Sequence, residues 1–201
     1  MIGCTMGSTM SALVLLLLSF VTPPAPQAPD YAGLYTQGVP YAEFLDGVRS
    51  RADGWKRNSS SATVAADIAS RVKAIDGRRR ILVVGEASCS DSVSTIPYLA
   101  KLVETAPDRL EMRIVDSTLG RAVMEAHRAP DGRAATPTVV VLDGNGAFIG
   151  AWVERPAELQ KWYDAQKPVI ATRELTAQKM KWYEADAGRS TLAEVVALLT
   201  R

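Results

Sequence analysis

Two stripes of apolar residues at helical spacing lie within residues 40–77. Their positions are Tyr41, Phe44, Leu45 and Val48, followed by Val64, Ile68, Val72 and Ile75. Pro40 suits the first turn of the first helix, and Gly77 suits the end of the second. Residues 58–61, an asparagine and three serines, are able to cap the second helix at its start. The pattern predicts a helical hairpin over residues 40–77.

From residue 81 the pattern changes to that of β-strands separated by helices. The continuous apolar run Ile81–Val84 is typical of a strand that is buried on both faces. The expected strands cover residues 81–84, 110–115, 138–142 and 147–153, and helices are expected at 93–103, 119–127 and 156–162. The sequence Asp-Gly-Asn-Gly at 143–146 is a strong hairpin turn.

The predicted order is therefore β-α-β-α-β-β-α. Two strands joined by a helix should be parallel with a right-handed crossover, and two joined by a tight turn must be antiparallel. We expect an α/β fold with a mixed sheet flanked by helices. A C-terminal helical extension follows, in which Gly188 suits a helix stop and Thr191 and Glu194 have capping-box spacing.

The N-terminal residues 1–29 contain no Asp, Glu, Lys or Arg. An apolar run from Ala12 to Val21 precedes a proline-rich stretch, which predicts an export signal or a membrane anchor followed by a linker. The alternative is a start codon assigned too early, which would leave the protein in the cytoplasm. The expected division is 1–29 signal or anchor with linker, 30–78 N-terminal helical segment, 79–166 core and 167–201 C-terminal extension.

Composition narrows the classes of function. The net charge is +1, from 23 basic and 22 acidic residues, which gives no indication of a nucleic-acid partner. One histidine and two cysteines do not form a zinc-ligand cluster. Neither a glycine-rich phosphate loop nor a lipase-type serine motif is present. We therefore expect no metal and no organic cofactor.

The candidate chemistry is centred on Cys89, between the first buried strand and the next helix. Ligands bind at such strand ends in open α/β sheets, and a helix N-terminus favours an anion such as a thiolate. The carboxylate of Asp91, two residues further on, opposes a second negative charge if the side chains approach each other. The alternative is an inert, buried cysteine at a strand–helix corner.

The sequence Cys89-Ser-Asp-Ser92, the Pro97 that follows in the expected helix, and Thr136-Pro137 before a strand together resemble the thioredoxin superfamily. The resemblance implies a thioredoxin-like fold. It also implies a cis peptide bond before Pro137, in a loop that lies against Cys89. The backbone of Thr136 would then receive a substrate strand.

A narrower resemblance is to bacterial thioredoxin-family proteins with a Glu-x-Trp-Cys-x-Asp motif. The matching segments are Glu86–Asp91, Gly132–Pro137, Arg155–Ala157 and the helical tail, within roughly residues 31–201. Two positions depart from the family pattern. Ser88 stands in place of the tryptophan, and Ser92 stands in place of the second cysteine of a dithiol motif.

The resemblance implies a monothiol redox protein in which Cys89 exchanges with protein or low-molecular-weight thiols and disulfides. Ser88, Ser92, Thr136 and Pro137 are the expected substrate-binding residues. Asp91 and Arg133 are candidates for tuning the thiol, although Arg133 fits a solvated loop arginine slightly better. The alternative function is a redox-inactive binding or chaperone-like module that uses the groove beside the proline.

Other conspicuous side chains receive no catalytic role. His127 ends an expected helix, where it would be a C-terminal cap charge or simply exposed. Trp152, Trp162 and Trp182 have amphipathic spacings and are expected to pack in the core or between helices.

Overall fold

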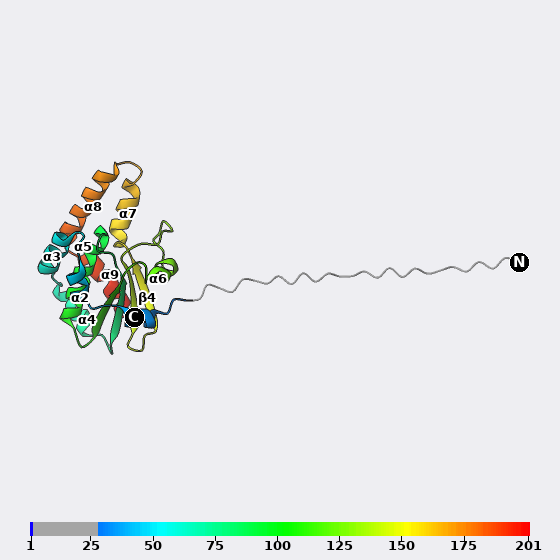
Figure 1. Cartoon of the computed structure of the whole chain (residues 1–201). Helices are drawn as coiled ribbons and strands as arrows, with labels where there is room; N and C mark the ends of the chain where they lie inside the picture. The colour runs from blue at the N-terminus through cyan, green and yellow to red at the C-terminus, as the bar shows by residue number, and fades with distance from the viewer. Residues whose placement is uncertain (2–27) are drawn as a thin grey trace.

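The computed structural model describes Met1 and residues 28–201 (Figure 1). The export or anchoring segment expected within residues 1–29 therefore lies almost entirely outside the described residues. Of the helices that the structure describes, none combines the length and the apolar character needed to cross a membrane.

A four-stranded mixed sheet lies at the centre of the described chain. Its strands are β1 (Arg79–Val84), β2 (Leu110–Val115), β3 (Thr138–Asp143) and β4 (Phe148–Val153). The spatial order is β2-β1-β3-β4, with β1 parallel to β2 and antiparallel to β3, and with β3 antiparallel to β4. The predicted α/β class, the parallel first pair and the antiparallel last pair are confirmed.

The turn between β3 and β4 forms as the sequence predicts. The Asp143 carboxylate accepts hydrogen bonds from the backbone N–H groups of Asn145 and Ala147, each at 2.8 Å. Gly146 has a φ of +91°, a conformation that is open to glycine and costly for other residues. This turn aligns β4 beside β3, so that the C-terminal end of β4 lies next to the start of β3.

The two faces of the sheet carry separate cores. Along β1, Ile81 and Val83 face one core while Leu82 and Val84 face the other, and all four are fully buried. Fully burying such a side chain contributes about 1.5–3 kcal/mol relative to its exposure. The first core is covered by α3 (Ala52–Ser61), α4 (Ala66–Lys73), α5 (Ser90–Thr105) and α9 (Arg189–Leu199), and the second by α1 (Tyr31–Gln37) and α6 (Arg121–Ala126).

The N-terminal part is helical, but the expected hairpin is wrong in detail. Residues 40–77 form three helices, α2 (Tyr41–Gly47), α3 and α4, where two were expected. The helix α1 precedes them. The serines expected to cap a helix lie inside α3. The backbone reverses at Arg51, whose φ is +55°, and Trp55 is the fully buried residue that anchors α3. One large aromatic side chain therefore secures a helix that has no apolar stripe.

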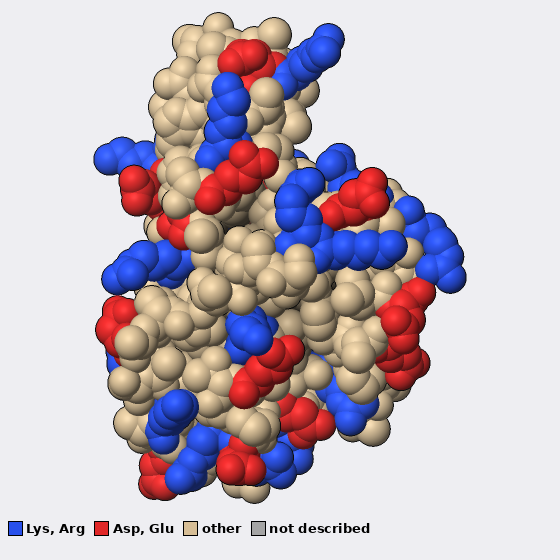
Figure 2. Space-filling model, turned by 90° about the vertical axis from the view of Figure 1, so that its left-hand side faces the viewer, with Lys and Arg blue, Asp and Glu red and all other residues tan. Residues whose placement is uncertain are grey.

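The C-terminal part is also helical. α7 (Ala157–Gln166) and α8 (Thr172–Asp186) lie side by side and rise above the end of the sheet, whereas α9 returns to pack on β4 (Figure 1). In the space-filling view of Figure 2 a hollow separates this upper lobe from the main body. Basic and acidic side chains are interspersed on that face, without a large patch of one sign.

Gly188 separates α8 from α9 with a φ of +76°, as expected for a helix stop. The expected capping box, in contrast, does not form. Thr191 lies inside α9 and is fully buried. Glu194 instead accepts hydrogen bonds from the Trp152 indole at 2.6 Å and from the Ala157 backbone N–H at 2.8 Å. α9 already begins at Arg189, so Thr191 lies about one turn after the N-cap position that a capping box requires.

Candidate functional site

Cys89 lies where β1 leads into α5, as predicted. A short loop follows the strand, and Cys89 is the N-cap residue of the 16-residue helix. Its side chain is partly exposed, and the Sγ atom lies 3.2 Å from the carbonyl oxygen of Thr136. The unpaired N–H groups of the first helical turn favour negative charge at this position. The sulfur is thus accessible and faces the loop that the resemblance implies.

The loop opposite Cys89 is fixed from both of its ends. The Thr136–Pro137 peptide bond is cis, as the resemblance implies. The Thr138 hydroxyl donates to the Ala135 carbonyl at 2.7 Å, and the Pro137 carbonyl accepts from the Glu154 N–H at 2.8 Å. Pro137 is buried while Thr136 is partly exposed, so Thr136 offers the surface beside the sulfur.

The two serines expected to bind substrate have different positions. Ser88 is exposed next to Cys89. Ser92 is fully buried, and its hydroxyl accepts a hydrogen bond from the Glu86 N–H at 3.3 Å. The expectation that Ser92 touches a substrate is therefore wrong, because the first turn of α5 directs the Ser92 side chain into the interior. The Glu86 carboxylate also accepts from the N–H and the hydroxyl of Ser117, which secures the loop.

Asp91 does not act as a free opposing charge. It is 4% exposed and is held by three donors. The Arg155 Nε lies at 3.1 Å, the Lys179 Nζ at 2.5 Å and the Tyr183 hydroxyl at 2.8 Å. A buried carboxylate is tolerated only when it is paired and hydrogen-bonded in this way. Asp91 is thus the centre of a buried polar cluster that ties α5 to the C-terminal helices.

Arg155 extends this buried cluster to three further side chains. Its guanidinium donates to Glu154 at 2.6 Å and to Gln160 at 3.0 Å, and it stacks over the Tyr163 ring at 4.0 Å from the centroid. Burial raises the pKa of Glu154, and the neighbouring Arg155 partly opposes this. We call Asp91, Glu154, Arg155, Lys179 and Tyr183 the buried charge cluster.

Tyr183 shows how strongly the cluster is desolvated. Burial raises the pKa of Tyr183 well above its ordinary value, and the neighbouring Asp91 carboxylate raises it further. The hydroxyl therefore remains a donor to Asp91 throughout the physiological pH range.

Arg133 is not the cation that offsets Asp91. Its Nε lies 2.7 Å from Asp131, and its terminal nitrogen lies 2.9 Å from Glu154. Its side chain is 47% exposed, so these pairs lie at the edge of the buried charge cluster. The hydrogen bonds that the guanidinium donates to Asp131 and Glu154 raise the pKa of Arg133. Asp91 is paired with Arg155 and Lys179 instead, and the exposure of Arg133 fits the alternative of a solvated loop arginine.

Two residues of α3 and its N-cap residue contact the cysteine loop or the first turn of α5, and sequence reasoning missed all three contacts. Arg51 Nε donates to the Ser88 carbonyl at 2.6 Å, and the Trp55 indole donates to the Ala87 carbonyl at 3.0 Å. Asn58 donates to the Val93 carbonyl at 2.8 Å. The only sequence signal was a tryptophan in an otherwise polar segment. The N-terminal helices thus fix the backbone on both sides of Cys89.

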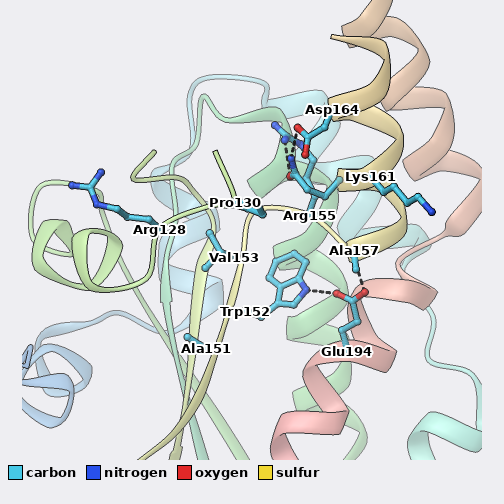
Figure 3. Close-up of a pocket in the computed structure, with 11 residues that line it drawn as sticks. Arg128, Pro130, Ala151, Trp152, Val153, Arg155, Ala157, Lys161, Asp164 and Glu194 are labelled. Atoms are coloured by element: carbon cyan, nitrogen blue, oxygen red, sulfur yellow. Dashed lines mark hydrogen bonds between the residues drawn. The ribbon is translucent and has the colours of Figure 1, made fainter. Parts of the chain in front are cut away.

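A cavity of about 510 Å³ adjoins the buried charge cluster on the side of β4 (Figure 3). It lies between β4, α7, α9 and the loop at residues 128–130, and Trp152 and Arg155 form part of its wall. Trp152 is 7% exposed, which agrees with the expected packing role, whereas Trp162 and Trp182 are only partly buried.

The contacts of His127 are with an aromatic cluster, and not with Cys89 or the buried charge cluster. Its Nε2 is hydrogen-bonded to the Tyr31 hydroxyl at 2.7 Å, and its ring stacks on Phe148 at 5.2 Å. Burial lowers the pKa of His127, so the ring packs as a neutral group near pH 7. Across the described residues, no group of three or more His, Cys, Asp or Glu side chains is arranged to hold a metal ion.

A mixed sheet, a cysteine at the start of a helix and a facing cis-proline loop define the thioredoxin class of fold. A family model described as thioredoxin matches residues 38–169. This span is more than half of the chain, and the protein therefore belongs to the thioredoxin family.

Two solved structures resemble this chain over most of its length. One is a protein of unknown function from Pseudomonas aeruginosa, with 25% identity and a TM-score of 0.65 over 85% of this chain and 97% of its own. The other is an HIV epitope scaffold, with 24% identity and a TM-score of 0.64 over 85% of this chain and 98% of its own. A comparison with curated proteins gives no match.

Proposed function

We propose that the protein is a monothiol redox protein that carries out thiol–disulfide exchange through Cys89. The observation that carries the proposal is the position of Sγ. Cys89 is a partly exposed residue at the N-terminus of α5, and its side chain faces the cis-proline loop. Thiolates are the reactive species in exchange, and this end of a helix favours them.

The exchange would proceed in three balanced steps. The Cys89 thiolate attacks one sulfur of a partner disulfide, so that a mixed disulfide forms and the other partner sulfur leaves as a thiolate. An external thiolate then attacks the Cys89 sulfur of the mixed disulfide, so that the first partner sulfur leaves as a thiolate and the external sulfur is bonded to Cys89. A second external thiolate attacks the first external sulfur, forms a disulfide with it and releases Cys89 as a thiolate. Over two such external thiols, the partner disulfide gains two electrons and two protons.

An external thiol is required because no second cysteine lies among the described residues. Ser92 occupies the position of a second motif cysteine, and its hydroxyl is buried against the Glu86 backbone. Cys89 is the one free cysteine of the described residues. The proposed partners are consequently proteins or small molecules with thiols or disulfides.

Trapping of the mixed disulfide tests the proposal. Purified protein is incubated with glutathione disulfide or with a glutathionylated peptide, and adducts are identified by mass spectrometry. We expect an adduct on Cys89 that reduced glutathione releases, and no adduct at this position in Cys89→Ser. Cys4→Ser is the matched control, because it removes the other cysteine and should leave the adduct intact. Absence of any adduct on Cys89 over a range of pH would refute the proposal.

A second function, a redox-inactive binding module, is favoured by one observation. Sγ lies within reach of the Thr136 carbonyl, a contact that the protonated thiol makes as donor and that a thiolate cannot make. For such a module the surface at Thr136, beside Pro137, would bind a polypeptide without exchange. In that case Cys89→Ser retains the partners that the native chain captures, whereas a redox protein loses them.

We also propose that the protein is exported or anchored through its N-terminal segment. The support is the uncharged, apolar composition of residues 1–29. N-terminal sequencing of protein from fractionated bacterial cells tests this proposal. A mature chain that begins near Tyr31 in a periplasmic fraction supports export, and an intact chain in a membrane fraction supports anchoring. An intact Met1 in the cytosol contradicts both.

A further inference from the structure

We propose that Lys179, on the C-terminal helix α8, is a positioning residue of the Cys89 site. Its ammonium group balances the Asp91 carboxylate and so keeps the start of α5 favourable to a thiolate. The inference rests on the thiol chemistry proposed above, and it identifies a part of the chain that regulates this chemistry.

Lys179 contacts the two residues that directly follow Cys89. Its Nζ lies 2.5 Å from Asp91 Oδ2 and 3.0 Å from Ser90 Oγ. The side chain is 6% exposed, so solvent screens its charge only weakly. A positive charge at this place acts in the same direction as the helix dipole. Lys179 therefore adds to the field at the N-terminus of α5 and removes the opposing effect of Asp91.

The charged and titratable groups around Asp91 come from every element packed against it. They are Glu154, Arg155 and the more exposed Arg133 from the loops, Tyr163 from α7, Lys179 and Tyr183 from α8, and Arg51 at the Ser88 carbonyl. Among the buried groups, two carboxylates face two cations. Removal of the Lys179 charge leaves this buried set with one net negative charge.

Lys179 is better suited than Arg155 to set this balance. Arg155 forms ion pairs with both Asp91 and Glu154, so its charge is shared between two carboxylates. Among the ion pairs of the described residues, Lys179 pairs with Asp91 alone. Its loss therefore leaves the charge of Asp91 only partly offset, two residues from the thiol. A negative charge near a thiol favours the protonated form.

Alkylation of Cys89 by iodoacetamide as a function of pH tests the inference. We expect Lys179→Met to react about tenfold more slowly at pH 7 than the native chain, with the pH profile moved to higher pH. Lys179→Arg retains the charge and should stay within about twofold of the native rate. In the double variant Asp91→Asn with Lys179→Met the buried charges balance again, and the native profile should return.

Lys101→Met is the control for loss of a lysine charge, because Lys101 is an exposed residue of α5 and pairs with Glu104. Its profile should match that of the native chain. A Lys179→Met profile with the native midpoint and only a lower plateau would indicate a purely structural role and overturn the inference. An unrestored profile in the double variant, with circular dichroism showing that it is folded, would overturn it as well.

The alkylation experiment can fail or succeed separately from the disulfide-exchange experiment. Alkylation reports on the thiolate whether or not Cys89 exchanges with disulfides. If no mixed disulfide forms but the Lys179→Met profile moves, disulfide exchange is refuted and the inference on Lys179 stands. If the mixed disulfide forms and the profile does not move, the reverse holds.

Discussion

The N-terminal and C-terminal parts of the chain contact the segment around Cys89 with different chemistry. On the N-terminal side, Arg51 and Trp55 donate to backbone carbonyls of the loop. On the C-terminal side, Arg155 and Lys179 bind the carboxylate of Asp91. Hydrogen bonds to the backbone fix its path, whereas paired charges set the local electric field. We therefore expect the N-terminal helices to fix mainly the backbone path at the site, and Arg155 and Lys179 to balance the buried charge of Asp91.

Among the variants that test this comparison, Arg155→Met should lower the free energy of unfolding most. It leaves Asp91 and Glu154 as buried carboxylates with too little positive charge, so we expect the free energy of unfolding to fall by about 3–5 kcal/mol. Urea unfolding measures the loss. Arg133→Met, which removes a half-exposed arginine at the edge of the cluster, should cost about 1 kcal/mol or less. Similar losses in both variants would show that the burial of Arg155 is unimportant.

Trp55→Phe should have the next largest effect on the free energy of unfolding. It should change the packing beside the cysteine loop without changing any charge. The change leaves the Ala87 carbonyl without its donor and opens space in the core, at a cost of about 2 kcal/mol in the free energy of unfolding. Thermal or urea unfolding gives the loss. The pH profile of Cys89 alkylation should keep its midpoint, because no charge changes. A moved midpoint would contradict the division between shape and charge.

Arg51→Met should produce a smaller change, because Arg51 is exposed. The lost hydrogen bond to the Ser88 carbonyl is worth about 0.5–1.5 kcal/mol. Hydrogen exchange should show faster exchange of the loop amides at 86–89, with little change in the core strands. Equal acceleration throughout the chain would mean that Arg51 supports the whole fold rather than the loop.

Glu154→Gln should give the smallest effect, visible as a pH dependence. Burial raises the pKa of Glu154 in the folded chain, so the protonated form is favoured by folding. This contribution to stability is full below the unfolded pKa and is lost as pH rises through the folded pKa. Urea unfolding of the native chain between pH 4 and pH 7 should therefore include a decline that Glu154→Gln lacks. A steeper decline in the variant would reverse the sign and contradict the assignment.

Local patterns in the sequence determined most of the fold that positions the site. The mixed sheet was predicted from the run Ile81–Val84, the Asp143–Gly146 turn and the order of strands and helices along the chain. The position of Cys89 at a helix start followed from the same periodicity. The short helices at the N-terminus were harder to predict. α3 has Trp55 as its single buried residue, and one residue gives no periodic signal.

The sequence by itself determined the elements and the place of Cys89, because periodicity, turn residues and helix breakers act over a few neighbouring residues. Only the tertiary structure decided the surroundings of the sulfur. Asp91 finds its partners 64 to 92 residues further along the chain, at Arg155, Lys179 and Tyr183. The burial of Ser92 depends likewise on how α5 packs. Ion pairs and burial follow from which distant elements meet, and sequence spacing carries no record of that.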